Sequence, residues 1–96
     1  MVMAETAIQP PGPGNAAELT IADMRRRIDM VDEAIIQLWQ ERTSISRRIG
    51  SIRLETGGTR VVLSREQQVI ERFHAGLGVD GTTIALLVLR AGRGPL

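Results

Sequence analysis

The sequence predicts an all-α fold with three helices per chain, one long and two short, assembled as an intertwined homodimeric helical bundle. Apolar residues recur every three or four positions over residues 20–55, a spacing that only a helix places on one face. Two shorter apolar segments follow, and glycines bound each of them. The one strand-like run, residues 61–63, has no partner run with which to form a sheet.

The first 18 residues differ in composition from the rest of the chain. They hold three of the four prolines together with several glycines and alanines, and they cannot supply a core. We therefore expect residues 1–18 to form a disordered N-terminal tail and residues 19–96 to form one helical domain.

The long helix is predicted to begin at Thr20, because Thr20 and Asp23 resemble a capping box. It would extend to about residue 55, and its length of about 50 Å exceeds what a compact chain of this size can cover. Its apolar seam then needs a second chain, which favours a dimer. The seam comprises Ile21, Met24, Ile28, Val31, Ile35, Leu38, Ile45, Ile49 and Ile52.

Two short helices should follow a loop over residues 56–63. The first should begin at Ser64, with Gln67 completing a capping box, and should end near Gly76 and Gly78. The second should begin at about Asp80 or Thr82 and stop at the glycines after residue 91. The unbroken apolar run over residues 84–89 indicates that this last helix is buried on most sides.

Composition excludes several kinds of chemistry. The chain has no cysteine and one histidine, His74, so thiol nucleophiles, disulfides and histidine clusters for metals are not available. No apolar run is long enough to span a membrane, and the N-terminus lacks the pattern of a signal peptide. We therefore expect a cytoplasmic protein.

All 12 basic residues are arginine, whose planar fork of donors suits carboxylates and phosphates. A G+C-rich genome would give the same count, but it does not explain the position of Arg42, which occupies the apolar seam. A cation there needs an anion, either an acid such as Glu33 or Glu41 of either chain, or an anionic ligand, and the pattern leaves both open. Arg53 lies about three turns further along roughly the same face.

Two further groups could join such a site. Arg25 is too distant to share a pocket with Arg53 of its own chain, although it could reach the pocket of the other chain in an antiparallel dimer. Equally, residues 25–27 could form a solvated basic turn. At the start of the second helix, Arg65 and Glu66 lie where free N–H groups attract anions, although an ordinary helix start would look the same.

Two strings, MRRRIDMVDEAIIQLWQERTSISRRIGSIR and TRVVLSREQQVIERF, resemble the all-helical chorismate mutase family. The shared features are Arg and Ile-Asp early in a long helix, then Asp-Glu, Glu-Arg and Ile-Gly, and Ser-Arg-Glu opening the second helix. GGTR in the loop and the C-terminal LLVLRAGRG resemble the short actinobacterial subclass that DAHP synthase activates.

This resemblance implies an intramolecular Claisen rearrangement of chorismate to prephenate, in the shikimate pathway toward phenylalanine and tyrosine. It implies no metal and no organic cofactor. Position for position, Arg42 and Arg25 of the partner subunit would bind carboxylates, and Arg53 would contact the ether oxygen. Arg65 would help to hold a carboxylate. Glu66 and the backbone N–H of Val62 would meet the ring hydroxyl.

The sequence departs from longer relatives because its third helix stops before the position where they place a glutamine near the ether oxygen. Members of the short subclass are typically weak alone and dock onto DAHP synthase, and Arg90–Gly94 is the expected contact.

Two alternatives remain on the same fold, an isochorismate-pyruvate lyase and a non-catalytic interaction module in which Arg42 is salt-bridged. A nucleic-acid-binding module that uses residues 25–27, 47 and 48 is disfavoured by the net charge of only +1.

Overall fold

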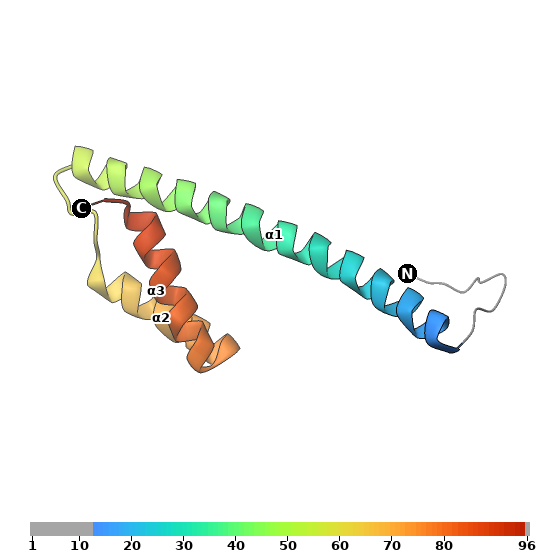
Figure 1. Ribbon diagram of the computed structural model, residues 1–96. Coiled ribbons are helices and arrows are strands. Elements are labelled where there is room, and N and C mark those ends of the chain that lie inside the picture. Colours follow the sequence, from blue (N-terminus) through green and yellow to red (C-terminus); the bar gives the residue numbers. More distant parts are fainter. Residues whose placement is uncertain (1–12, 96) are drawn as a thin grey trace. The chain divides into compact units, whose positions relative to one another are not determined.

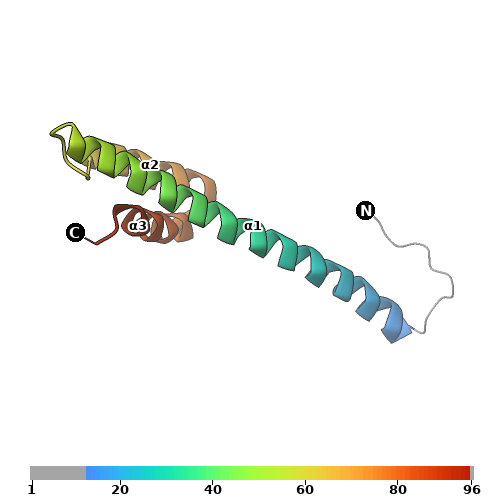
Figure 2. The same ribbon diagram turned by 90° about the horizontal axis from the view of Figure 1, so that it is seen from above.

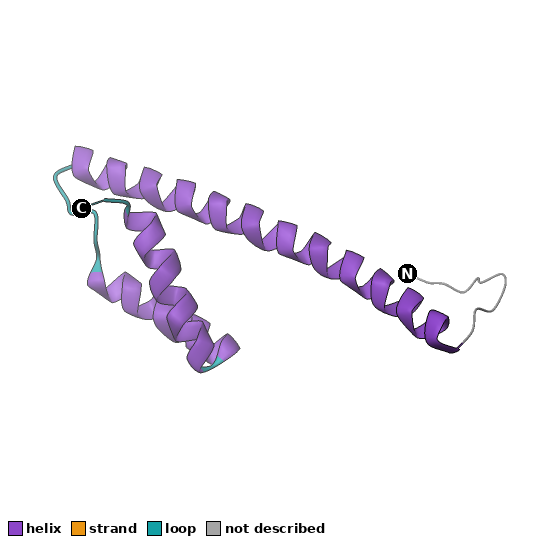
Figure 3. Cartoon of the chain, viewed as in Figure 1, coloured by secondary structure: helices purple, strands orange, loops and turns teal. Residues whose placement is uncertain are grey.

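The computed structural model describes residues 13–95, and these residues form three α-helices (Figures 1 and 3). They are α1 (Pro13–Glu55), α2 (Leu63–Leu77) and α3 (Val79–Arg93). Over that range no residue belongs to a strand. The predicted all-α class, with one long helix and two short ones, is confirmed.

Helix α1 begins earlier than the sequence suggested. Its first residue is Pro13, a residue suited to the first turn because its missing N–H would have no partner there. Thr20 is not an N-cap, since its hydroxyl donates to the carbonyl of Ala16 at 3.1 Å, one turn back inside the helix. Residues 13–18, which the composition assigned to the tail, are helical, and the rest of the predicted tail lies outside the described residues.

The chain divides into two units, Met1–Ile35 and Ile36–Leu96. The described part of the first unit is the N-terminal half of α1, and its side chains are almost all exposed. The second unit contains the C-terminal half of α1 together with α2 and α3.

Helices α2 and α3 pack against each other as a hairpin (Figures 1 and 2). Gly78 makes the turn between them with a φ of 74°, and its N–H donates to the carbonyl of His74. The hairpin encloses a small core of Val69, Ala85 and Leu89, against which Ile70 and Phe73 pack. Gly81 allows the close approach, because a Cβ there would collide with the carbonyl of Phe73.

The predicted start of α2 was wrong in detail. Its N-cap is Val62, in extended conformation, and no side chain caps the helix. The expected capping box does not form, since the Gln67 amide donates instead to Glu71 within the helix at 3.4 Å. Helix α3 likewise begins at Val79, and it continues through Gly92 to Arg93, with Gly94 as its C-cap.

Much of the apolar surface is uncovered in the single chain. The seam residues of α1 are exposed, among them Ile35 at 59%, Leu38 at 63% and Ile45 at 53%. The prediction that α3 is buried on most sides was wrong for one chain, because Leu86 remains 53% exposed while Ala85, Val88 and Leu89 are buried. Within the described residues, only four apolar side chains form the buried core.

Candidate functional site

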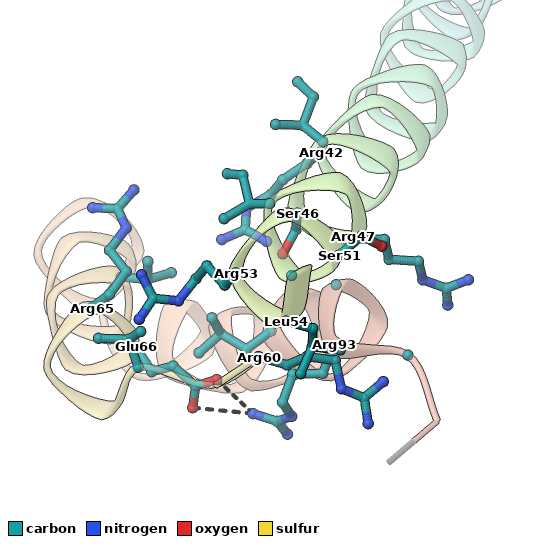
Figure 4. Close-up of a pocket in the computed structure, with 18 of the residues that line it drawn as sticks. Arg42, Ser46, Arg47, Ser51, Arg53, Leu54, Arg60, Arg65, Glu66 and Arg93 are labelled. Atoms are coloured by element: carbon teal, nitrogen blue, oxygen red, sulfur yellow. Dashed lines mark hydrogen bonds and ion pairs between the residues drawn. The ribbon is translucent and has the colours of Figure 1, made fainter. Parts of the chain in front are cut away.

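A cavity of about 440 Å³ lies between α1, the following loop, the start of α2 and the end of α3 (Figure 4). All of its lining residues belong to the second unit, from Arg42 to Pro95. A volume of this order suits a small organic ligand. The sequence supplies a mixed lining, with aliphatic side chains such as Ile49 and Leu89 beside a dense set of guanidinium groups.

The cavity is strongly cationic. Among the described residues, its lining includes six arginines and a single acidic residue, Glu66. Five of the predicted site residues are brought together here, namely Arg42, Arg53, Val62, Arg65 and Glu66. The other three lining arginines, Arg47, Arg60 and Arg93, were not predicted as site residues.

Arg42 is half-buried on α1 and donates from Nη1 to the carbonyl of Val88 on α3 at 3.4 Å. Burial lowers the pKa of its guanidinium below the ordinary value, and the positive charges of Arg65 and Arg72 lower that pKa further. No ion pair joins Arg42 to an acid within residues 13–95. Arg42 therefore has no ion-pair partner in this part of its own chain, which leaves an acid of a second chain or a ligand anion.

Arg53 is held by the loop that follows α1. Its Nε donates to the carbonyl of Thr59 at 2.9 Å, while its own carbonyl accepts from the N–H of Gly58 at 2.7 Å. Gly57, with a φ of 86°, allows the chain to turn sharply enough for these contacts. In Figure 4 the Arg53 side chain extends from α1 toward the first turn of α2, where Arg65 and Glu66 lie.

The first turn of α2 supplies the remaining predicted residues. The Val62 carbonyl accepts from the N–H groups of both Arg65 and Glu66 at 3.1 Å, which begins the helix at the cavity wall. Arg65 is exposed, and its Nη1 donates to the side chain of Gln68 at 3.3 Å. Glu66 is only partly exposed and forms an ion pair with Arg93 at 2.9 Å.

Two more arginines, one on α1 and one in the loop, bind the end of α3 and so close the cavity. Arg47 Nε donates to the carbonyl of Ala91 at 3.1 Å, and Arg60 Nη1 donates to the carbonyl of Pro95 at 3.0 Å. Arg42, Arg47, Arg53 and Arg60 therefore all bind main-chain carbonyls rather than carboxylates. A carbonyl orients a guanidinium without cancelling its charge, so the cavity stays positive.

Sequence reasoning missed Arg47, Arg60 and Arg93 because each is defined by a contact with a distant part of the chain. Arg93 meets Glu66, Arg60 meets Pro95, and Arg47 meets Ala91. Nothing in the local pattern around these arginines distinguishes them from surface residues. The one signal that could have found them was their type, since every cation of the chain is arginine.

Arg25 does not line the cavity. It is exposed on α1 and belongs to the first unit. The prediction brought it in from a partner subunit, so its role there stays a prediction.

The chemistry of the cavity follows from its guanidinium groups. Residues 13–95 contain no group of three or more His, Asp or Glu side chains arranged to hold a metal ion. No helix in that range has the length and apolarity needed to cross a membrane. What the cavity offers is recognition of a small anion by preoriented guanidinium groups, together with stabilisation of negative charge that develops on it.

The chain is similar in sequence to known proteins. Residues 24–87 match the model of the family described as chorismate mutase type II. The intracellular chorismate mutase of Mycolicibacterium smegmatis is 51% identical over 76 residues, which cover 79% of this chain and 73% of that protein. The protein of the same name from Mycobacterium tuberculosis is 47% identical over 76 residues, which cover 79% of this chain and 71% of its own length.

A solved structure is also similar, with a TM-score of 0.80 and 37% identity. It is a non-covalent complex of DAHP synthase and chorismate mutase from Corynebacterium glutamicum with a bound transition state analog. The similarity covers 84% of this chain and 98% of the matched chain.

Proposed function

The chain belongs to the chorismate mutase type II family and is a chorismate mutase, and we propose that the arginine-lined cavity is its substrate site. One observation carries this assignment. Arg42 and Arg53 line the cavity and donate to the neutral carbonyls of Val88 and Thr59, so both retain a charge that a dicarboxylate can meet. In the interaction-module alternative, Arg42 would instead be bound to a protein acid.

The reaction breaks the ether C–O bond of chorismate and forms a C–C bond within the same molecule, so no atom enters or leaves. Negative charge develops on the ether oxygen as the C–O bond lengthens. A donor aimed at that oxygen stabilises the transition state more than the ground state and so raises kcat. Arg53 takes this role in our assignment, because the loop carbonyl of Thr59 already fixes its Nε and leaves its terminal nitrogens for the ligand.

The other lining residues hold the substrate in its reactive fold. Arg42 binds one carboxylate, and its half-buried position makes that contact stronger than a surface pair would be. Arg65 helps to hold the carboxylate end. Glu66 and the N–H of Val62 meet the ring hydroxyl. Holding the side chain over the ring in this way supplies a near-attack arrangement without any covalent step.

We propose that the protein acts as a homodimer in which Arg25 of the partner subunit completes each site. The exposed seam of α1 supports a dimer, because large apolar side chains such as Ile28, Ile35 and Ile45 are each more than half exposed in the single chain. A second copy of α1 would cover this seam. The same pairing would carry an arginine from the N-terminal half of one α1 to the cavity of the other chain.

A DAHP synthase is the proposed protein partner. The solved relative forms a complex with such an enzyme, and this supports an equivalent partner for this chain. We assign the contact to Arg90–Gly94, where Arg90 is exposed and residues 92–94 line the cavity.

The curated relatives are named intracellular, which supports an intracellular, cytoplasmic location here as well.

The direct test follows the loss of chorismate absorbance when purified protein is added, with and without DAHP synthase from the same source. We expect turnover by the chain alone and faster turnover in the mixture. Absence of chorismate turnover both with and without DAHP synthase would contradict the site assignment. Release of pyruvate from isochorismate at a higher kcat/KM than chorismate turnover would instead identify the lyase alternative.

A further inference from the structure

Among residues 13–95, Glu66 is the only acid that lines the cavity, and Arg93 is the only residue of that range that binds its carboxylate. Nη1 of Arg93 lies 2.9 Å from one carboxylate oxygen of Glu66 and 3.1 Å from the other. Both side chains are mostly covered, with 19% of the Glu66 side chain and 29% of the Arg93 side chain exposed. Dashed lines in Figure 4 join the Glu66 carboxylate to Arg93, and Arg42 lies on the opposite side of the view.

Such an acid presents a problem for a site that binds a dianion. Glu66 shares the cavity with Arg42, Arg53 and Arg65, and within residues 13–95 these arginines donate to uncharged acceptors. A free carboxylate in this position would pair with one of them, because charge-assisted hydrogen bonds are the strongest available contacts. An arginine paired in that way would have to exchange a protein carboxylate for a substrate carboxylate and would gain little.

We propose that Arg93 is a positioning residue that, by occupying both oxygens of Glu66, keeps this carboxylate off the substrate-binding arginines and aimed at the substrate hydroxyl. The inference rests on the proposed function, since it presumes that Arg42 and Arg53 bind the substrate. A carboxylate has about four acceptor positions, and Arg93 occupies two, so Glu66 can still accept a hydroxyl hydrogen bond.

The backbone on both sides of Arg93 is fixed, so the Arg93 side chain can hold the Glu66 carboxylate in one position. Gly92 is buried against Ser46 of α1, and the carbonyl of Ala91 is held by Arg47. On the other side, Arg60 binds the carbonyl of Pro95. The end of α3 is thereby attached to α1 and to the loop independently of the ion pair.

The test is a double-mutant cycle of Arg93→Ala and Glu66→Gln, assayed on chorismate without DAHP synthase so that docking plays no part. In Arg93→Ala we expect KM to rise about tenfold, the effect of about one charge-assisted hydrogen bond, while kcat at saturation stays within about twofold. KM rises because Glu66 competes with the substrate for the arginines, whereas kcat is kept because saturating substrate displaces Glu66 from them.

In the Glu66→Gln background the same Arg93→Ala change should alter KM by less than about twofold, because a neutral amide does not compete for guanidinium groups. Arg93→Lys should keep KM within about threefold of the unchanged protein, since an ammonium can occupy the place of Nη1. Arg48→Ala is the matched control, because Arg48 is exposed on α1, lies outside the cavity and carries the same charge.

A purely structural role would have a different signature. The KM effect of Arg93→Ala would then be the same whether position 66 carries the carboxylate or the amide, and that result would overturn the inference. So would an unchanged KM in a folded Arg93→Ala protein. If Arg93→Ala does not fold by circular dichroism, Arg93→Met keeps the length of the stem, and the same cycle is run with it. If the unchanged protein shows no turnover of chorismate, by contrast, the proposed substrate site itself is contradicted.

Discussion

Gly92 of α3 and Ser46 of α1 are in such close contact that a Cβ at position 92 would lie 2.5 Å from Ser46 Oγ and 2.8 Å from Ser46 Cβ. This contact sets the separation of α1 and α3 at the cavity. The carbonyls of Val88 and Ala91, which hold Arg42 and Arg47, lie on the same stretch of α3. Two small residues therefore determine where two of the arginines find their acceptors.

Gly92→Ala should push α3 away from α1 and lower the free energy of unfolding by about 1–3 kcal/mol, the usual effect of overpacking. Urea unfolding followed by circular dichroism measures this change. Gly76→Ala is the matched control, because nothing lies within 4 Å of a Cβ there, and it should be neutral or stabilising by up to about 1 kcal/mol. Combining Gly92→Ala with Ser46→Gly should restore part of the loss; no recovery would show that the clash lies elsewhere.

Arg53→Ala should reduce kcat/KM severely, because it removes the charge that we aim at the breaking C–O bond. Loss of one such donor costs about 3–4 kcal/mol of transition-state stabilisation. Arg53→Lys should retain more activity, since it keeps a positive charge at that position. Steady-state kinetics on chorismate measures both. Turnover near the unchanged level in a folded Arg53→Ala protein would exclude the assignment.

Arg42→Met should have opposite effects on stability and on activity. The lowered pKa of Arg42 shows that burial, together with Arg65 and Arg72, disfavours its charge in the folded chain. An uncharged side chain of similar length should then raise the free energy of unfolding, while chorismate turnover falls sharply. Urea midpoints, compared at one protein concentration, measure the first effect. A lower midpoint would indicate that Arg42 has a stabilising anionic partner in the assembled protein.

Mixing Arg25→Ala and Arg42→Ala proteins tests whether a site is built from two chains. Each variant alone should be nearly inactive. In a mixed dimer one site contains both intact arginines, so part of the activity should return after the subunits exchange. Native mass spectrometry establishes that the mixed dimers have formed. If they form and the activity stays at the level of the single variants, Arg25 does not act across the dimer.

The periodic pattern predicted the architecture well, because long helices follow from side-chain spacing that the sequence states directly. Helix boundaries were predicted less well. Thr20 and Ser64 both have the residue type of an N-cap, yet Thr20 bonds to Ala16 inside α1 and Val62 precedes α2 as its cap. A hydroxyl has several possible partners near a helix start, and packing elsewhere decides which one it takes.

The candidate site was predicted only as far as the family motifs extend. Arg42, Arg53, Val62, Arg65 and Glu66 lie in the matched segments, and all five line the cavity. Gly92 had been expected to stop a helix, whereas it lies inside α3 as a packing surface for Ser46. The ion pair of Arg93 with Glu66 joins two separate helices, and no local rule indicates such a contact.

The use of main-chain oxygens as arginine acceptors has an evolutionary consequence. Arg42, Arg47, Arg53 and Arg60 bind the carbonyls of Val88, Ala91, Thr59 and Pro95, and every residue type presents a carbonyl. The side chains at these four acceptor positions can therefore change without loss of the carbonyl acceptor, provided that the backbone conformation is kept. In a set of orthologues we expect the four arginines to vary independently of their partners. Correlated substitution is expected instead between positions 66 and 93, where two charged side chains of different helices meet.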